Sequence, residues 1–304
     1  MTKLARTNSF DFARFSAATA VIFSHHFPIA GRIEPRWLGI TWGGLAVDVF
    51  FLMSGYLIAK SIINKPDFSR FLAARVLRIL PNLIFVLVLT SLVTLISFQN
   101  SENILGHLRY VLQNIVMLVR GGPYYGINGV FEGRPEHAIN GSIWSLPYEV
   151  WCYFVLFAAL VLLPRLRTVT MASLTVLCIA AWIQLDYTLP GTGINLGKLG
   201  MLGTPFFVGA LFATTGNQIP LLSSPKMAWF SRGGDPSYGM YIFAWPVQQY
   251  CTLLIGNFWI SMLVAFLVTT ALGYCTWHGF ERRFLANVER LAARFRGLRG
   301  AKQA

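Results

Sequence analysis

Long apolar stretches recur along this chain and restrict it to one class of fold. Eight of them have about the 17–25 residues that an α-helix uses to cross a bilayer. Inside hydrocarbon every backbone polar group must be bonded within the protein, so apolar stretches of this length form helices. They are residues 9–29, 43–63, 80–98, 143–163, 169–187, 199–215, 237–256 and 258–277. The sequence therefore predicts an all-α, polytopic transmembrane helix bundle.

A ninth apolar stretch, residues 104–119, carries polar residues such as His107 and Arg109. Two interpretations stay open for it, a short interfacial or re-entrant helix and a further span, so 8–10 spans are predicted. The surrounding segment, 99–141, is rich in glycine and also contains tyrosine, and we expect a flexible external loop there.

The charge content supports a membrane protein with a defined orientation. Only 12% of the 304 residues are charged and 55% are hydrophobic, whereas a soluble protein has about 25% charged residues. The net charge of +13 would suggest nucleic-acid binding in a soluble chain. Here it fits basic cytoplasmic loops, and no nucleic-acid partner is expected. In the eight-span layout 19 of the 25 Lys and Arg residues fall on the side of the N-terminus, which predicts that both termini are cytoplasmic.

The chain divides after its last apolar stretch. Residues 1–281 are predicted to form the membrane unit, and residues 282–304 a basic, partly amphipathic tail that lies on the anionic inner leaflet. The first ten residues lack the layout of a cleaved signal peptide, so the first apolar stretch is expected to remain a span. The four cysteines lie in apolar runs without a C-x-x-C pair, so neither a metal nor a disulfide is expected.

The first apolar stretch carries Asp11, Arg14, His25 and His26. Ionisable groups at membrane depth are costly and need partners or a task. Asp11 can pair with Arg14 one turn later. His25 follows Arg14 by eleven residues, which returns it to within about 20° of the same helix face, about 16 Å further along. The alternative is an Arg14 that extends to the headgroups and a histidine pair at the opposite interface, and His26 in particular is expected to be an interface residue.

Two carboxylates are predicted near the level of His25. Asp48 lies about five residues inside the second span, and Glu149 one to two turns inside the fourth. Either could orient the His25 imidazole, although Asp48 could also face water at the start of its helix. A carboxylate inside a span is rare without a function.

Arg75 and Arg78 are three residues apart and share one face of a helix, and Pro81 is expected to break that helix where the third span begins. The pair is either an ordinary cytoplasmic basic cluster or a clamp for phosphate groups, since arginine donates two parallel hydrogen bonds. Near the C-terminus, Asp235 is predicted to cap a helix, and Glu281 to pair with one of the arginines that follow it.

Five motifs, in order, resemble those of the acyltransferase family 3 of multi-span membrane proteins. The resemblance covers nearly the whole chain. The motifs are D-x-x-R-x10-H at Asp11, Arg14 and His25; D-x-F-F-x-x-S-G at Asp48, Phe50, Phe51, Ser54 and Gly55; R-x-x-R and a proline at Arg75, Arg78 and Pro81; W-S-L-x-x-E-x-x-x-Y at Trp144, Ser145, Leu146, Glu149 and Tyr153; and S-Y-x-x-Y-x-x-x-x-P at Ser237, Tyr238, Tyr241 and Pro246.

The resemblance implies a bacterial inner (plasma) membrane enzyme, an O-acyltransferase. Such proteins move an acyl group, commonly acetyl from acetyl-CoA, to a hydroxyl of a carbohydrate such as O-antigen or exopolysaccharide. The implied partners are membrane lipid, the acyl-CoA donor and the glycan acceptor, and no metal is implied. Many members have a histidine where Ala244 stands, which leaves more of the chemistry to His25.

On this interpretation Arg75 and Arg78 hold the donor's phosphates, and His25, oriented by Asp48 or Glu149, removes the proton from the acceptor or is itself acylated first. The site residues that complete the prediction are Arg14 as a catalytic residue; Phe50, Phe51 and Ser54 with the donor; and Asp11, Trp144, Tyr153 and Tyr241 with the substrate. The alternative is a proton-coupled transporter or exporter, in which Asp11, Arg14 and His25 form a proton relay. Inverted repeats would favour that alternative, and none is recognisable in the sequence.

Overall fold

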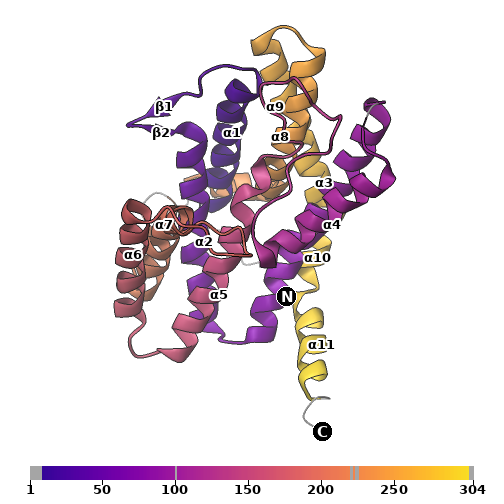
Figure 1. The fold of residues 1–304 in the computed structure, drawn as a ribbon. Helices are drawn as coiled ribbons and strands as arrows, with labels where there is room; N and C mark the ends of the chain where they lie inside the picture. Colours follow the sequence, from indigo (N-terminus) through magenta and orange to yellow (C-terminus); the bar gives the residue numbers. More distant parts are fainter. Residues whose placement is uncertain (1–8, 100, 220–221, 223–225, 301–304) are drawn as a thin grey trace.

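Helices make up most of the protein and stand side by side as a bundle (Figure 1). The computed structural model describes residues 9–99, 101–219, 222 and 226–300. The longer helices are α1 (Phe10–Ile29), α2 (Trp42–Asn64), α3 (Phe68–Ser97), α4 (Ile104–Arg120), α5 (Leu146–Leu162), α6 (Arg167–Gln184), α7 (Leu196–Thr214), α8 (Ser237–Leu254), α9 (Phe258–Thr276) and α11 (Val288–Gly300). Shorter elements are two 3-10 helices, η1 (Ser142–Ser145) and η2 (Ala228–Gly233), the π-helical turn η3 (Trp277–Glu281), α10 (Arg282–Ala286), and a small antiparallel pair, β1 (Arg36–Trp37) and β2 (Ile40–Thr41).

Each of the eight predicted spans contains one helix, and six described helical segments are long and apolar enough to cross a membrane. The protein is therefore a multi-pass membrane protein. The six segments are Trp42–Asn64, Phe68–Ser97, Ser142–Leu162, Arg167–Gln184, Leu196–Thr214 and Phe258–Ala286. Helices α1 and α8 are not among them, because polar side chains such as His25, His26, Gln248 and Gln249 lower their hydropathy.

Two local predictions need correction. Pro81 does not break the third helix: α3 runs unbroken from Phe68 to Ser97 with Pro81 inside it. Asp67 caps its start by accepting a hydrogen bond from the backbone N–H of Arg70 at 3.1 Å, so the helix begins twelve residues before the predicted span. The loop after α4 is also held in place rather than free, because the Asn114 side chain bonds both the N–H (2.9 Å) and the C=O (2.8 Å) of Tyr124.

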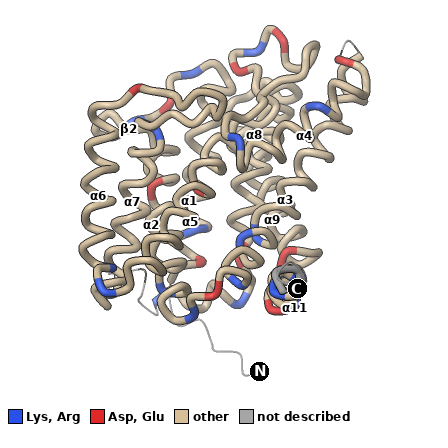
Figure 2. The backbone as a smooth tube through the Cα atoms, turned by 60° about the horizontal axis from the view of Figure 1, so that its bottom comes forward, with Lys and Arg blue, Asp and Glu red and all other residues tan. Residues whose placement is uncertain are grey.

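Helix α2 occupies the middle of the bundle, between α1 and α7, and α6 packs on the outer side of α7 (Figure 1). Most large side chains of α6 are exposed, for example Val176 (64%) and Ile183 (68%). An apolar exposed face of this kind is suited to lipid. Figure 2 shows long stretches of α6 and α7 without charged residues, whereas basic and acidic positions come together near α9 and α11.

Helices α2 and α7 approach closely through glycine. A Cβ atom on Gly55 would overlap the backbone carbonyl of Phe206, and a Cβ on Gly209 would overlap that of Leu52. The prediction that Gly55 serves close helix packing agrees with this contact.

Replacing Gly55 by alanine is expected to lower the stability of the bundle by about 1–3 kcal/mol, because the added methyl group forces α2 and α7 apart. Thermal unfolding of the detergent-solubilised protein measures this. Gly256→Ala is the control, since a Cβ there meets no atom within 4 Å. Equal melting temperatures for both variants would contradict the expectation.

Candidate active site

A cavity of about 260 Å³ lies among α1, α2, α3, α5 and α8 and gathers residues from all five motifs. Its polar lining contrasts with the apolar surface of the bundle. From the predicted site it includes Arg14, Phe50, Phe51, Ser54, Arg75, Arg78, Glu149, Tyr153 and Tyr241; it also includes Ser145, Asp235, Ser237, Tyr238, Trp277 and Leu285. Residues as far apart in the sequence as Arg14 and Leu285 thus share one chamber.

The two arginines of the R-x-x-R motif differ in their partners. Arg78 donates to Asp235 at 2.9 Å and lies 3.6 Å from Glu281, so two carboxylates compensate its charge. Arg75 has no ion pair among the described residues: its guanidinium lies 5.2 Å from the ring centroid of Tyr153, and its Nε is buried without a hydrogen-bond partner. Arg75 is therefore the guanidinium of this pair that is available to an anion.

Arg14 reaches the same cavity from α1. It lies 3.4 Å from Asp11, as the spacing predicts, and 3.3 Å from Asp235. Asp11 is buried and does not line the cavity, and it contacts the site through Arg14. Burial by itself would raise the pKa of Asp235, but the guanidinium groups of Arg78 and Arg14 and hydrogen bonds from Ser237 outweigh it and hold that pKa well below its usual range.

Glu149 lies with the arginines rather than with His25. Its Oε1 accepts a hydrogen bond from Ser54 at 3.2 Å and another from the Tyr153 hydroxyl. The predicted contact with His25 is not found, because the 3-10 turn η1 carries the chain inward before α5 begins and places Glu149 opposite the middle of α2. Ser145 and Tyr241 also line the cavity, and their side-chain oxygens are joined by a hydrogen bond of 2.8 Å.

Asp48 also lies away from His25. It lines a separate crevice of about 330 Å³ with Trp144 and Trp182, on the side of α2 that faces α7. Helix α2 presents Ala46 to α1, and Asp48 is two residues later, about 200° around the helix. The depth of Asp48 in the membrane does not determine the direction in which its side chain points. No described contact supports the prediction that Asp48 orients His25.

His25 does not line the cavity but lies one turn beyond it. Its ring packs edge-to-face against Trp245, with centroids 5.1 Å apart, and Trp245 follows the cavity residue Tyr241 by one helical turn. The Nδ1 atom of His25 is buried and makes no hydrogen bond among the described residues. Ala244 is fully buried in the seam between α1 and α8.

The sequence suggested that His26 lies at the membrane interface, but His26 is fully buried within the bundle. Its Nε2 lies 2.9 Å from the Ser261 hydroxyl of α9, and its Nδ1 lies 3.3 Å from Gln248 of α8. Both nitrogens therefore have partners, and His26 joins α1 to α8 and α9. The two adjacent histidines differ accordingly: one is bonded into the bundle and the other is not.

The residues that sequence reasoning missed are the carboxylate partners of the arginines. Glu281 pairs with Arg78 of α3 and not with the arginines that follow it, because the π-helical turn η3 directs it into the bundle, where it is 2% exposed. Asp235 was predicted to cap α8, but Pro236 occupies the N-cap position and its side chain makes no capping bond. Asp235 instead accepts from the backbone N–H of Ser237 at 3.3 Å, and its other oxygen lies against Arg14 and Arg78. The sequence did offer one sign of the Glu281 position. Asn82 is a polar residue in the middle of the apolar helix α3, and its side chain donates a hydrogen bond to Glu281.

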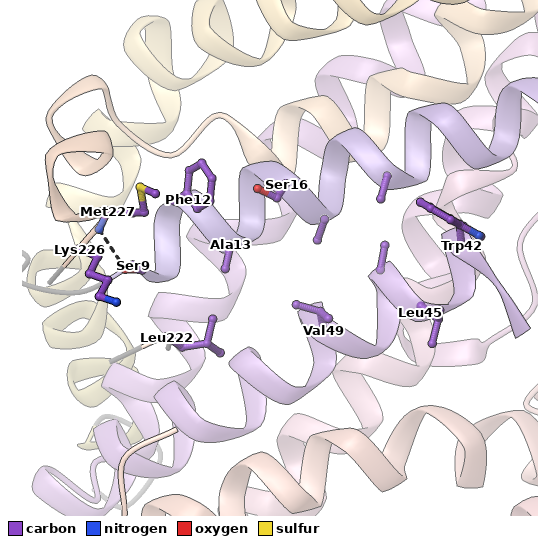
Figure 3. A pocket seen from close by; sticks show the side chains of 13 residues that line it. Ser9, Phe12, Ala13, Ser16, Trp42, Leu45, Val49, Leu222, Lys226 and Met227 are labelled. Atoms are coloured by element: carbon purple, nitrogen blue, oxygen red, sulfur yellow. Dashed lines mark hydrogen bonds between the residues drawn. The ribbon is translucent and has the colours of Figure 1, made fainter. Parts of the chain in front are cut away.

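A larger groove of about 520 Å³ between α1 and α2 contains none of the predicted site residues (Figure 3). Small side chains of α1 and α2 form its floor, with Trp42 at one end and Met227 and Lys226 at the other. Its lining offers little acid–base chemistry. Among the described residues no group of three or more His, Cys, Asp or Glu side chains could hold a metal ion.

The helix α11 is fastened to the start of α3 by ion pairs at exposed positions. Glu289 lies 2.8 Å from Arg70 and 3.5 Å from Lys65, and Arg296 lies 2.6 Å from Asp67. Leu285, just before α11, lines the cavity, so the tail lies at the cavity's edge. Residues 301–304 of the predicted tail lie outside the described residues, as do Lys3 and Arg6 of the predicted cytoplasmic charges.

Acid is expected to release this tail. Hydrogen bonding from Arg70 lowers the pKa of Glu289. Slight burial raises the pKa of Asp67, but the backbone amide of Arg70 and the charge of Arg296 outweigh this effect, so the pKa of Asp67 is lowered overall. The tail is therefore fully docked when the pH is above the ordinary carboxyl pKa of about 4. It is released as the pH falls through the lower pKa values that Asp67 and Glu289 have in the docked state. Hydrogen exchange of residues 288–297 measures it. At pH 7 the double variant Asp67→Asn, Glu289→Gln should protect this segment as weakly as wild type does in acid, with each exchange rate divided by the intrinsic rate at its own pH. Protection equal to that of wild type at pH 7 would contradict the expectation.

Fold and cavity together define a class, a multi-pass membrane protein with a cationic cavity inside its helix bundle. Residues 7–228 match the model of the family described as an acyltransferase domain, Acyl_transf_3. The chain belongs to this acyltransferase family, as the motifs indicated, and is a transferase enzyme.

Two relatives show how far the similarity extends. The chain is 30% identical to an O-acetyl transferase of Shigella phage Sf6, over 92% of this chain and 96% of that protein. It is 24% identical to Nodulation protein 10 of Rhizobium leguminosarum bv. viciae, over 59% of this chain and 51% of that protein. No solved structure matches the chain.

Proposed function

We propose that this protein is an O-acyltransferase that moves an acyl group, acetyl in the simplest case, from acyl-CoA to a hydroxyl of a carbohydrate. The observation that carries the proposal is the cavity that contains Arg75, which has no carboxylate partner among the described residues. Tyr241 of its lining lies one helical turn before Trp245, and the Trp245 ring packs against His25. The O-acetyl transferase of Shigella phage Sf6, similar over nearly its whole length, supports the transfer of acetyl to oxygen.

The donor's phosphates would bind at the arginine side of the cavity. Arg75 supplies an uncompensated guanidinium, which can donate two parallel hydrogen bonds to a phosphate. Phe50, Phe51 and Ser54 of α2 line the same chamber and would contact the thioester arm. Along α1, His25 is about 16 Å from Arg14, so the extended arm must direct its acyl end towards Trp245.

His25 would supply the acid–base chemistry. In direct transfer the imidazole takes the proton of the acceptor hydroxyl, the oxygen attacks the thioester carbonyl, and the carbon–sulfur bond breaks. The thiolate then leaves with that proton as free CoA. In the two-step route the imidazole nitrogen carries the acyl group first. Trapping labelled acetyl on the wild-type protein, with loss of the label in His25→Ala, identifies the two-step route.

The orientation follows from the same proposal. Arg14, Arg78, Asp235 and Glu281 meet at one end of the bundle, which we assign to the cytoplasm of a bacterial inner membrane with 8–10 spans and both termini inside. The loop after α4, which bonds to the other end of α8 through Trp245 and Ala138, would then face the acceptor. Alkaline phosphatase fusions that are active after Gly300 would contradict this orientation.

Purified protein given acetyl-CoA and a glycan extract from its own cells tests the function. Free CoA, followed with a thiol reagent, should appear only with the acceptor, together with an acetyl ester on the glycan detected by mass spectrometry. A deletion strain should lose that ester while the glycan amount stays the same. Loss of the glycan itself from the surface, with no thioester cleavage by the protein, would instead indicate a transporter.

A further inference from the structure

The buried carboxylate of Asp235 lies between two guanidinium groups from different helices. It accepts hydrogen bonds from Arg14 of α1 at 3.3 Å and from Arg78 of α3 at 2.9 Å, both through Oδ2. Its Oδ1 accepts from the backbone N–H and the hydroxyl of Ser237 at the start of α8. Asp235 thus joins three helices at one point, and it is only 2% exposed.

Glu281 holds Arg78 from a second side. Its Oε2 lies 3.6 Å from Arg78, and its Oε1 accepts from Asn82 at 2.5 Å and from Thr276 at 3.0 Å. Arg14 and Arg78 share Asp235, and each has a second carboxylate, Asp11 for Arg14 and Glu281 for Arg78. Removal of the charge of Asp235 therefore removes the anion that links Arg14 of α1 to Arg78 of α3 and to the start of α8.

Without Asp235, Arg14 and Arg78 would be two like charges held close together in a largely dehydrated space. Such charges repel, and the carboxylate that lay between them would no longer compensate the repulsion. Helix α1 carries Arg14 near its start and His25 near its end. A rigid helix transmits a displacement at Arg14 to His25, because both lie on the same helix face.

We propose that Asp235 is a positioning residue, which fixes Arg14 beside Arg78 and thereby sets the position of α1 and its His25 relative to the donor cavity. The expected effect on kcat rests on the proposed function, whereas the expected effect on the position of α1 does not. Asp235 does not itself bind the donor: it is an anion on the wall of a cavity proposed to receive a polyanion.

The kinetic signature separates positioning from binding. In Asp235→Asn the side-chain shape stays while one negative charge leaves the cavity wall. We expect kcat per folded molecule to fall at least 10-fold, while KM for acetyl-CoA stays equal or falls. Asp235→Glu keeps the charge on a longer side chain and should recover part of kcat. The control is Asp186→Asn, an exposed carboxylate outside the cavity that bonds to Asn195, and it should match wild type.

A second measurement does not depend on turnover. Hydrogen exchange of residues 12–18 of α1 should be faster in Asp235→Asn than in wild type, and nearer to wild type in Asp235→Glu. If the asparagine variant does not fold, the glutamate variant provides the test. We then expect faster hydrogen exchange of residues 12–18 than in wild type and a 3- to 10-fold lower kcat.

Three results would overturn the proposal: wild-type kcat and exchange in Asp235→Asn, a raised KM with unchanged kcat in that variant, or a glutamate variant with wild-type kcat when asparagine is not tolerated. Failure of the proposed function has a different signature, since wild-type protein would then leave acetyl-CoA intact while the exchange difference at α1 remains.

Discussion

His25→Ala is expected to lower turnover by about 10²–10⁴-fold, the usual contribution of a general base. The His25 Nδ1 is buried without a hydrogen-bond partner among the described residues, so His25→Ala breaks no bond at that atom and removes the ring contact with Trp245. It also lies outside the lining of the arginine cavity, so acetyl-CoA binding should stay within a few-fold of wild type. Release of CoA measures turnover, and isothermal titration with acetyl-CoA measures binding.

The neighbouring residue is the matched control. His26→Ala removes one buried hydrogen bond from the Ser261 hydroxyl and one from Gln248, which should cost about 1–3 kcal/mol of stability in total. Each group keeps a backbone carbonyl as a partner, Phe258 for Ser261 and Ile22 for Gln248. The folded fraction of that variant should nevertheless turn over at close to the wild-type rate. A variant of His26 that is stable but inactive, beside an active His25→Ala, would mean that the wrong imidazole has been assigned.

Arg75→Ala is expected to raise KM for acetyl-CoA about 10- to 100-fold with kcat changed little. A hydrogen bond to a charged group contributes about 1.5–3 kcal/mol, and about 1.4 kcal/mol corresponds to a factor of ten. Arg75 makes no ion pair among the described residues, so its removal leaves no carboxylate there without a partner. Arg75→Lys should lie between wild type and alanine, because lysine keeps the charge but not the two-point geometry.

Arg78→Ala should behave differently although it belongs to the same motif. It leaves Asp235 and Glu281, both 2% exposed, without their shared partner. Loss of one member of a buried ion pair costs about 3–5 kcal/mol. We therefore expect a lower melting temperature for Arg78→Ala and an unchanged one for Arg75→Ala. Equal melting temperatures with equal KM values would show that the two arginines act alike.

Much of the architecture can be predicted from hydropathy alone. The eight apolar stretches each became a helix, since a stretch that must bond its backbone internally has few other choices. The pairing of Asp11 with Arg14 followed from their separation of three residues on one helix. Nine of the predicted site residues also line one cavity, although nothing in the helical pattern places residues of separate helices together.

The sites that were predicted wrongly share one feature, a contact between different helices. Glu149 and Asp48 were expected beside His25 on the basis of depth, yet Glu149 faces Ser54 and Asp48 faces α7. Glu281 was expected to pair with its neighbours in sequence and instead reaches Arg78. Depth along a helix follows from counting residues, but the direction of a side chain depends on how the whole helix is rotated.

By itself the sequence determined which segments form helices and which residues share a face of each one, because the period of an α-helix is fixed by its backbone. Only the tertiary structure decided the partners: Asp235 lies between Arg14 and Arg78, and His26 is bonded to Ser261. Within the described part of the chain, Arg75 has no carboxylate partner and the His25 Nδ1 has no hydrogen bond. The physical reason is that close packing, such as that of Gly55 on α7, sets the rotation of each helix against its neighbours.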